Sequence, residues 1–169
     1  MKKTNILRLV MGALFAALVF IATSIFPIPI ASTAGYIHLG DMIIYLAACL
    51  LPAPYAILAA VIGAGLADAL VAPVYILGTV IVKALLALTF SSKTDRILQK
   101  RNVIAPIVCV FITVIGYSVY DMILFSSFEA GLIGLFMNFI QASSSALLFY
   151  IVAAALDRFG LKKKIWRKV

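Results

Sequence analysis

The sequence predicts an all-α integral membrane protein with six transmembrane helices and both termini in the cytoplasm. Of its 169 residues, 65% are hydrophobic and 12% are charged, whereas a soluble domain is about half apolar and about a quarter charged. A folded chain of this size cannot hide so much apolar surface from water, so we expect its solvent to be lipid. Proline-containing and polar breaks then divide the chain into helices, and clusters of basic residues orient them.

Four helices are predicted from apolar segments bounded by such breaks. The first apolar segment ends before Pro27-Ile28-Pro29, and two later ones end at the polar stretches Ser91–Asn102 and Ser126–Gly131. A helix needs about 20 apolar residues to cross the hydrocarbon layer of a bilayer, and these segments have roughly that length. They place helices at about 6–26, 74–91, 103–126 and 131–156.

The uncharged stretch from Met42 to Ala67 is divided by Pro52-Ala53-Pro54. A proline inside a helix removes a backbone hydrogen bond and clashes with the preceding turn, so two prolines one residue apart indicate a tight turn. Helices of about 39–51 and 54–71 are expected on either side. Residues 1–169 should therefore form a single six-helix membrane domain.

Three clusters of Lys and Arg predict the orientation. They lie at the N-terminus, between residues 93 and 101, and in the tail from Arg158 to Lys168. Cytoplasmic segments of membrane proteins are enriched in Lys and Arg. Six helices put all three clusters on the cytoplasmic side, and the opposite connections, at 27–38, 71–74 and 126–131, contain neither residue.

The formal net charge of +8 would suggest nucleic acid binding in a soluble protein. Here the clusters at the membrane surface account for it, and no basic–aromatic groove motif accompanies them, so no nucleic acid partner is expected. Cys49 and Cys109 lie in apolar segments, where cysteine packs as a small residue. Without a CxxC or a Cys/His cluster, the sequence predicts neither a metal nor another cofactor.

Four ionisable residues lie within the predicted membrane region: Asp41, Asp68, Lys83 and Asp121. Such groups are costly in lipid and usually face a cavity or a partner. Asp41 and Asp68 lie near helix ends, where they either cap the helix or contribute to a polar site. Lys83 and Asp121 lie deeper, and they either pair between the fourth and fifth helices or contact a ligand. These two interpretations are compatible.

The sixth helix carries Asn138 and Gln141, which are three residues apart and share a helix face. Their amides offer donors and acceptors that suit a neutral heteroaromatic ligand, although amides also join helices in lipid. Tyrosines at 75, 117 and 120 could stack on such a ring. The predicted site contains no catalytic group and comprises Tyr36, His38, Asp41, Asp68, Tyr75, Lys83, Tyr120, Asp121, Asn138 and Gln141.

Several motifs together resemble those of the substrate-binding S components of energy-coupling factor (ECF) vitamin transporters. The segment Gly35–Asp41 resembles the outer-loop motif of that family, and Gly63–Asp68 and Ile81–Ala84 resemble the next two motifs in order. Asn138-x-x-Gln141 resembles a motif of helix six. The Ala13-x-x-x-Ala17 pair is similar to the alanine motif with which S components dock on their coupling subunit, since small residues let helices approach closely.

This resemblance implies a multi-pass subunit of a prokaryotic cell membrane that binds a vitamin or precursor from outside with high affinity. It would topple in the membrane while associated with a transmembrane T subunit and two cytoplasmic ATPases, which hydrolyse the ATP. The pattern looks closest to the riboflavin, pyridoxine and hydroxymethylpyrimidine branch. A vitamin B6-like or hydroxymethylpyrimidine-like ligand is expected, and riboflavin less so, because the chain is short and its loops are small.

Two other classes remain open at this point. Tyr120-Asp121 resembles one half of the aspartyl intramembrane protease pair, but Gly65-Leu66-Ala67-Asp68 departs from the required Gly-x-Gly-Asp and comes in the wrong order. A single His and no Gly-x-Ser-Gly argue against zinc or rhomboid chemistry, so an enzyme is not expected. The other alternative, a self-sufficient small transporter or a structural membrane subunit, would not need an ATPase.

The orientation can be tested by cysteine labelling in a background without Cys49 and Cys109. A cysteine at Ser32 should react with an impermeant thiol reagent added to intact cells, because connection 27–38 is expected outside. A cysteine at Ser92 should react only after the cells are opened. The reverse pattern would contradict the six-helix topology.

Overall fold

The computed structural model describes residues 3–25, 27–29 and 36–166. Within these ranges the chain is all-helical apart from a two-stranded hairpin, which confirms the predicted fold class. Four of the helices are long and apolar enough to cross a membrane: α1, α3, α5 and α6. In order, the elements are α1 (Lys3–Ser24), β1 (Ile28–Pro29), β2 (Tyr36–Ile37), α2 (Gly40–Leu50), α3 (Ala53–Val71), the 3-10 turn η1 (Pro73–Tyr75), α4 (Ile76–Thr89), α5 (Lys100–Leu124), α6 (Phe128–Arg158) and α7 (Leu161–Trp166).

The proline pair separates α2 from α3. Leu51 leaves the helix with an extended backbone, and Pro52 follows as the residue before α3 at φ −57° and ψ 145°. Pro54 then lies in the first turn of α3, where a missing N–H breaks no helical hydrogen bond. The short α2 therefore ends at Leu50 and is a helix separate from α3.

Some helix ends differ from those expected from the sequence. The fourth predicted helix divides into η1 and α4. Helix α6 begins at Phe128 because Ser127 caps it, its hydroxyl accepting a hydrogen bond from the N–H of Ala130 at 3.3 Å. At the other end the chain turns through Gly160, at φ 61°, into the additional short helix α7.

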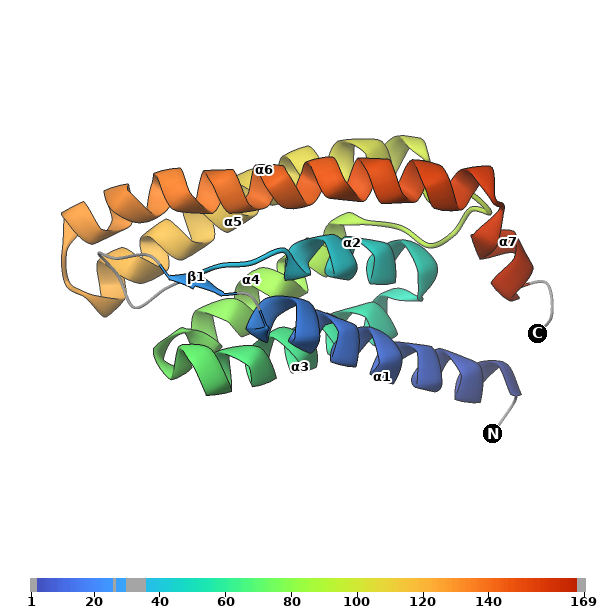
Figure 1. The fold of residues 1–169 in the computed structure, drawn as a ribbon, viewed down its shortest axis with the longest axis horizontal. Helices are drawn as coiled ribbons and strands as arrows, with labels where there is room; N and C mark the ends of the chain where they lie inside the picture. The colour runs from blue at the N-terminus through green and yellow to red at the C-terminus, as the bar shows by residue number, and fades with distance from the viewer. Residues whose placement is uncertain (1–2, 26, 30–35, 167–169) are drawn as a thin grey trace.

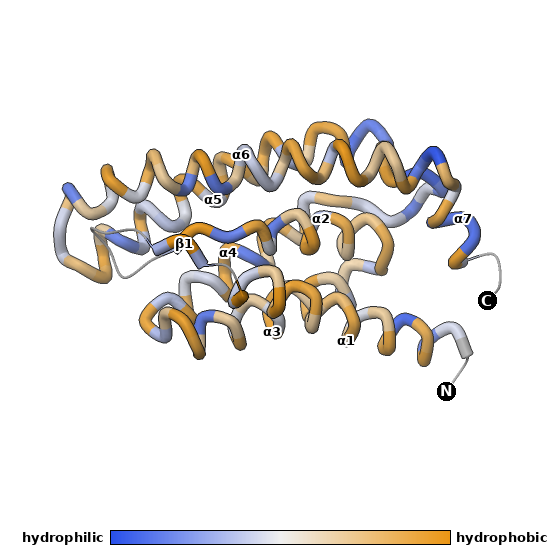
Figure 2. The backbone as a smooth tube through the Cα atoms, viewed as in Figure 1, coloured by the Kyte–Doolittle hydropathy of each residue, from blue (hydrophilic) through white to orange (hydrophobic). Residues whose placement is uncertain are grey.

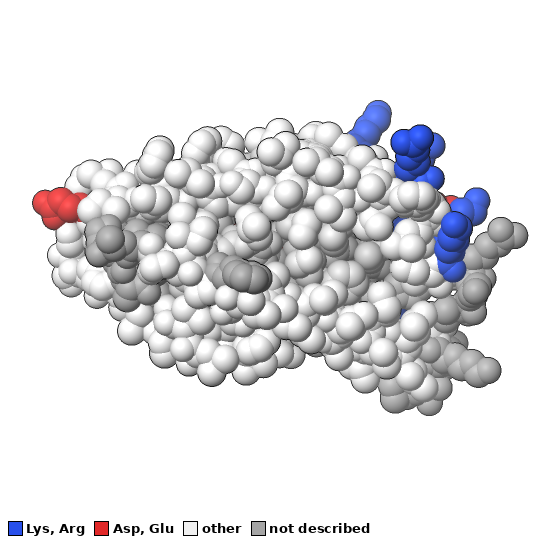
Figure 3. Space-filling view, in the orientation of Figure 1, with Lys and Arg blue, Asp and Glu red and all other residues white. Residues whose placement is uncertain are grey.

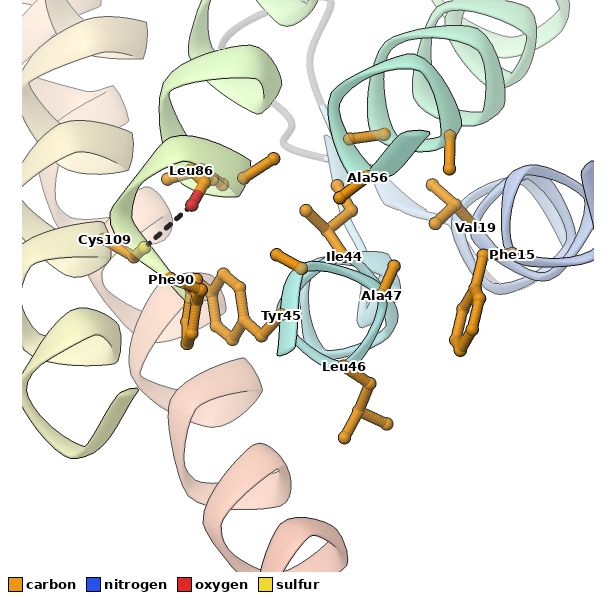
Figure 4. Packing of buried hydrophobic residues seen from close by; sticks show 14 of the residues in the cluster. Phe15, Val19, Ile44, Tyr45, Leu46, Ala47, Ala56, Leu86, Phe90 and Cys109 are labelled. Carbon is orange, nitrogen blue, oxygen red and sulfur yellow. Dashed lines mark hydrogen bonds between the residues drawn. The ribbon is translucent and has the colours of Figure 1, made fainter. Parts of the chain in front are cut away.

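The helices form two layers with α2 between them (Figure 1). Helices α5 and α6 run side by side in one layer, and α1 packs along α3 in the other. Helix α2 contacts α1, α3, α4 and α6. The Tyr45 ring of α2 stacks on Phe90 with centroids 5.0 Å apart (Figure 4). It also meets the edge of the Phe149 ring, with centroids 5.8 Å apart. The α2 helix is therefore the central element of the apolar interior.

Lipid is the solvent for most of the outer surface. Apolar residues continue along the outside of the long helices (Figure 2). Lys and Arg gather at the end of the molecule where both ends of the chain lie (Figures 1 and 3). Both described termini thus lie on one side, as an even number of crossings requires. That this side is cytoplasmic stays a prediction.

Gly63 permits the close approach of α1 and α3. A Cβ atom placed on Gly63 would collide with the backbone oxygen of Ala16 and would lie 2.8 Å from Cβ of Val19. Backbone cannot move aside as a flexible side chain can, so the two helices would have to separate. The position therefore requires a residue without a side chain.

We expect Gly63→Ala to lower the free energy of unfolding by about 1–3 kcal/mol through overpacking. Gly65→Ala is the matched control on the same helix, because the nearest atom to its Cβ would be Cγ2 of Val80, at an ordinary 3.7 Å. Thermal unfolding of both variants in detergent measures the difference. Equal stability of the two variants would show that the α1–α3 spacing is not tightly constrained.

Candidate substrate-binding site

A buried ion pair forms the centre of the candidate site. The ammonium of Lys83, on α4, lies 2.7 Å from Oδ1 of Asp41, in the first turn of α2, and both side chains are fully buried. The second oxygen of Asp41 accepts a longer hydrogen bond from the amide of Gln141, on α6, at 3.5 Å. Three helices thus meet at one carboxylate.

This pairing corrects two interpretations of the sequence. The partner of Lys83 is Asp41 and not Asp121, because α2 inserts its first turn beside α4. Asp41 makes no capping hydrogen bond for α2, whose N-cap residue is Leu39. The carboxylate instead compensates a charge that would be isolated inside the bundle.

The hairpin before α2 is fastened over this ion pair. The hydroxyl of Tyr36, on β2, donates to Oδ1 of Asp68, on α3, at 2.5 Å. The backbone N–H of His38 donates to Oε1 of Gln141 at 3.1 Å, and the His38 ring accepts from the N–H of Gly40. The connection from β2 to α2 is therefore held to both layers of the fold.

A second cluster of polar side chains lies between η1, α5 and α6. The hydroxyl of Tyr75 donates to Oδ1 of Asp121 at 2.6 Å. A Cβ placed on Gly134 would lie 2.5 Å from Oδ2 of Asp121 and 3.5 Å from Nδ2 of Asn138, so these two side chains flank the same point of α6. The missing side chain of Gly134 therefore lets the carboxyl group of Asp121 approach α6 beside Asn138.

Tyr117 and Thr79 connect the two groups. The hydroxyls of Tyr117 and Thr79 share a hydrogen bond of 2.8 Å, and the Lys83 ammonium lies 5.1 Å from the centre of the Tyr117 ring. The Tyr117 ring lies 6.4 Å from that of Tyr75. Thr79 was not among the predicted site residues, although it precedes Lys83 by one helical turn and so shares its face.

The structure brings most of the predicted residues together but places Tyr120 differently. The Tyr120 hydroxyl donates to the backbone oxygen of Val74 at 2.7 Å, and its ring covers Gly78. The Tyr120 side chain therefore connects α5 with η1 beside the polar site and is not part of it. The other nine predicted residues contribute to the two polar groups described above.

The site is rich in hydrogen-bond acceptors. It combines the carboxyl groups of Asp41, Asp68 and Asp121 with one ammonium, that of Lys83. Among the described residues, Oδ2 of Asp68 is buried and makes no hydrogen bond of standard geometry, although the Thr79 hydroxyl also interacts with this carboxyl group. A buried acceptor left unpaired costs about 1–3 kcal/mol, so a ligand that donates a hydrogen bond there would recover that energy. The arrangement suits recognition of a polar molecule, and the described residues contain no His/Cys/Asp/Glu group that could hold a metal.

A separate apolar groove lies between α1 and α3 on the lipid-facing surface. Its volume is about 490 Å³, and both Ala13 and Ala17 line it, together with Gly12 and Ala16. Larger side chains from both helices form its walls: Leu9, Phe20, Tyr55, Leu58, Ile62 and Leu66. The small residues of α1 therefore leave a shallow surface on which another apolar helix could pack.

The fold is therefore that of an all-helical membrane protein with a buried network of polar side chains in its interior. The model of the family described as "ECF-type riboflavin transporter, S component" matches residues 3–158. The chain belongs to this family: it is the S component of an ECF importer, a multi-pass membrane protein and not an enzyme.

The fold agrees with a solved structure. The chain is similar to the protein described in "Structure and mechanism of the S component of a bacterial ECF transporter", with a TM-score of 0.74 and 19% sequence identity. The alignment covers 92% of this chain and 98% of that one. No curated protein matches the sequence.

Proposed function

We propose that this S component binds a small heteroaromatic vitamin or precursor, of the vitamin B6 or hydroxymethylpyrimidine type, from outside the cell. The observation that carries the proposal is the buried, acceptor-rich network around Lys83 and Asp41, closed by Tyr36 and His38. Sites for small molecules are typically apolar with a few polar groups that fix orientation.

The composition of the network favours a ligand that carries hydrogen-bond donors. The unpaired oxygen of Asp68 and the carboxyl group of Asp121 can accept from an amino or hydroxyl group. The ammonium of Lys83 is already matched by Asp41. An added phosphate would face two further carboxyl groups without a free cation among the described site residues, so the unphosphorylated form of the vitamin is the proposed ligand.

The close spacing of the network favours a single six-membered ring. Tyr36 contacts Asp68 at 2.5 Å, and Asp41 contacts Lys83 at 2.7 Å and Gln141 at 3.5 Å. A three-ring flavin would need these partners to move apart, whereas one substituted ring can lie beside them. Riboflavin is nevertheless the second candidate, because the matching family is described by that vitamin.

A binding experiment separates these ligands. Purified protein should bind pyridoxine or hydroxymethylpyrimidine with high affinity in calorimetry, and riboflavin, followed by quenching of its fluorescence, should bind far more weakly. Gln141→Ala and Asn138→Ala should weaken binding about 5- to 150-fold, because each lost amide leaves a buried group unpaired at about 1–3 kcal/mol.

Gln99→Ala is the control for this experiment. It removes an amide that bonds the backbone oxygen of Ser91 at the far, basic end of the molecule, so ligand affinity should not change. Tight riboflavin binding would replace the B6-type assignment with the flavin. Unchanged affinity in both the Gln141 and Asn138 variants would leave these amides as contacts between helices and remove them from the site.

We further propose that the groove between α1 and α3 receives the T subunit of an ECF module that also contains two cytoplasmic ATPases. The support is the shape of the groove, whose floor is made of small residues at Gly12, Ala13, Ala16 and Ala17. It lies on α1 and α3, away from Lys83 on α4, so ligand binding and partner binding use different surfaces.

Ala13→Trp or Ala17→Trp should therefore abolish vitamin uptake by cells that produce the whole transporter, because a bulky side chain fills the groove. Ligand binding by the isolated S component should persist. Ala154→Trp, at an exposed position of α6 in the other layer, should leave uptake largely intact. Loss of ligand binding with normal assembly would instead connect the groove with the ligand site.

A further inference from the structure

The basic end of the molecule contains a second, polar pocket. Its volume is about 330 Å³, and it lies where α1, the α2–α3 turn, the connection after α4 and α7 meet. The residues that line it are Thr4, Arg8, Leu50, Pro52, Ser92 and Trp166. Four segments that are distant in the sequence thus surround a space that the described part of the chain does not fill.

Two cations at this end of the molecule have a buried nitrogen without a hydrogen-bond partner among the described residues: Arg8, which lines the pocket, and Lys162 on α7. The Arg8 guanidinium lies 5.9 Å from the centre of the Trp166 ring, and its Nε is buried without a hydrogen-bond acceptor. Lys162 precedes Trp166 by four residues and so shares its face of α7. The Lys162 side chain is 4% exposed, and its ammonium is also buried without a hydrogen-bond partner.

The nearest acidic groups do not satisfy these cations. The carboxylate of Asp157 accepts the backbone N–H groups of Ile97 and Leu98 at 2.7 and 2.8 Å, so both of its oxygens are engaged. Asp157 and Asp95 act on Lys162 only through longer-range attraction, and burial lowers the pKa of Lys162 below its usual range. An anion in the pocket would pair with Arg8, which lines it, and would lower the cost of burying the charge of Lys162, on the helix that contributes Trp166 to the lining.

We propose that this pocket binds a phosphate group, and that the group belongs to the headgroup of an anionic phospholipid. Arg8 lines the pocket and Lys162 lies on α7, one turn before the lining residue Trp166, so both supply positive charge, and the hydroxyls of Thr4 and Ser92 supply neutral donors.

The surroundings favour a lipid over a soluble anion. Ile6 and Leu9, on either side of Arg8 in α1, are 47% and 56% exposed on the surface that faces acyl chains. Trp166 is of the residue type that concentrates at the membrane interface. A phospholipid can therefore place its phosphate in the pocket and its acyl chains along α1.

The chain has a single tryptophan, Trp166, so its fluorescence reports on this pocket directly. Purified full-length protein in non-ionic detergent is titrated with phosphatidylglycerol carrying brominated acyl chains, and separately with brominated phosphatidylcholine. The anionic lipid should quench Trp166 with at least about tenfold higher affinity, because a charged hydrogen bond contributes more than a neutral one. Equal quenching by the two lipids would overturn the proposal.

Charge variants distinguish a specific lipid site from general attraction of anionic lipid to a basic surface. Arg8→Gln and Lys162→Gln should each reduce the preference for the anionic lipid at least about tenfold. Lys163→Gln removes the same charge from an exposed neighbour on α7 and should keep the preference. If Lys163→Gln loses it to the same extent, the proposal fails.

Two further measurements complete the test. Ser92→Ala removes one neutral donor and is expected to fold even if a charge variant does not. The Ser92→Ala variant should bind the anionic lipid about threefold more weakly. An unchanged affinity would count against the site. Inorganic phosphate is titrated into the lipid-loaded protein. Displacement of the lipid at millimolar concentration supports the phosphate site but assigns it to a soluble anion, whereas retention of the lipid supports the headgroup.

Discussion

The ion pair between Lys83 and Asp41 constrains the interior of this protein more than any other contact among the described residues. Both groups are fully buried in a bundle whose outside is lipid. Removing one partner of such a pair costs about 3–5 kcal/mol, because the remaining charge is left uncompensated. The pair therefore fixes the first turn of α2 against α4. Tyr45, one turn further along α2, then has to meet Phe90 and Phe149 in the apolar core.

The same constraint places the hairpin. Because Asp41 begins α2, the residues just before it must lie at the edge of the polar network, where the His38 backbone reaches Gln141 and the Tyr36 hydroxyl reaches Asp68. The hairpin follows α1 directly in the chain. The proposed docking face on α1 and the segment that closes the proposed ligand site therefore belong to one continuous stretch, which gives partner binding and ligand release a short physical connection.

The two ends of the molecule have different chemistry. At the hairpin end, carboxyl groups outnumber the single buried ammonium, and the fold offers acceptors to a ligand. At the opposite end, Asp157 and Asn102 bind backbone groups of the 90–99 connection, and within the described part of the chain Arg8 and Lys162 form no ion pair. Acceptors at one end and unpaired cations at the other suit a neutral or donor-bearing ligand and an anionic group, respectively.

The sequence by itself determined the solvent, the helical class and the principal breaks, because these depend on local composition. Apolar segments of membrane length give helices whatever their neighbours, and Pro52 and Pro54 end α2 and start α3 through backbone sterics alone. It also singled out the four ionisable residues, since charges within apolar segments are rare.

Which charge pairs with which was decided only by the tertiary structure. The sequence suggested Asp121 as the partner of Lys83, and the insertion of α2 between the two layers places Asp41 there instead. The place of Tyr120 at the rim, and the pocket formed by four distant segments at the basic end, likewise depend on how the helices pack, which no local pattern encodes.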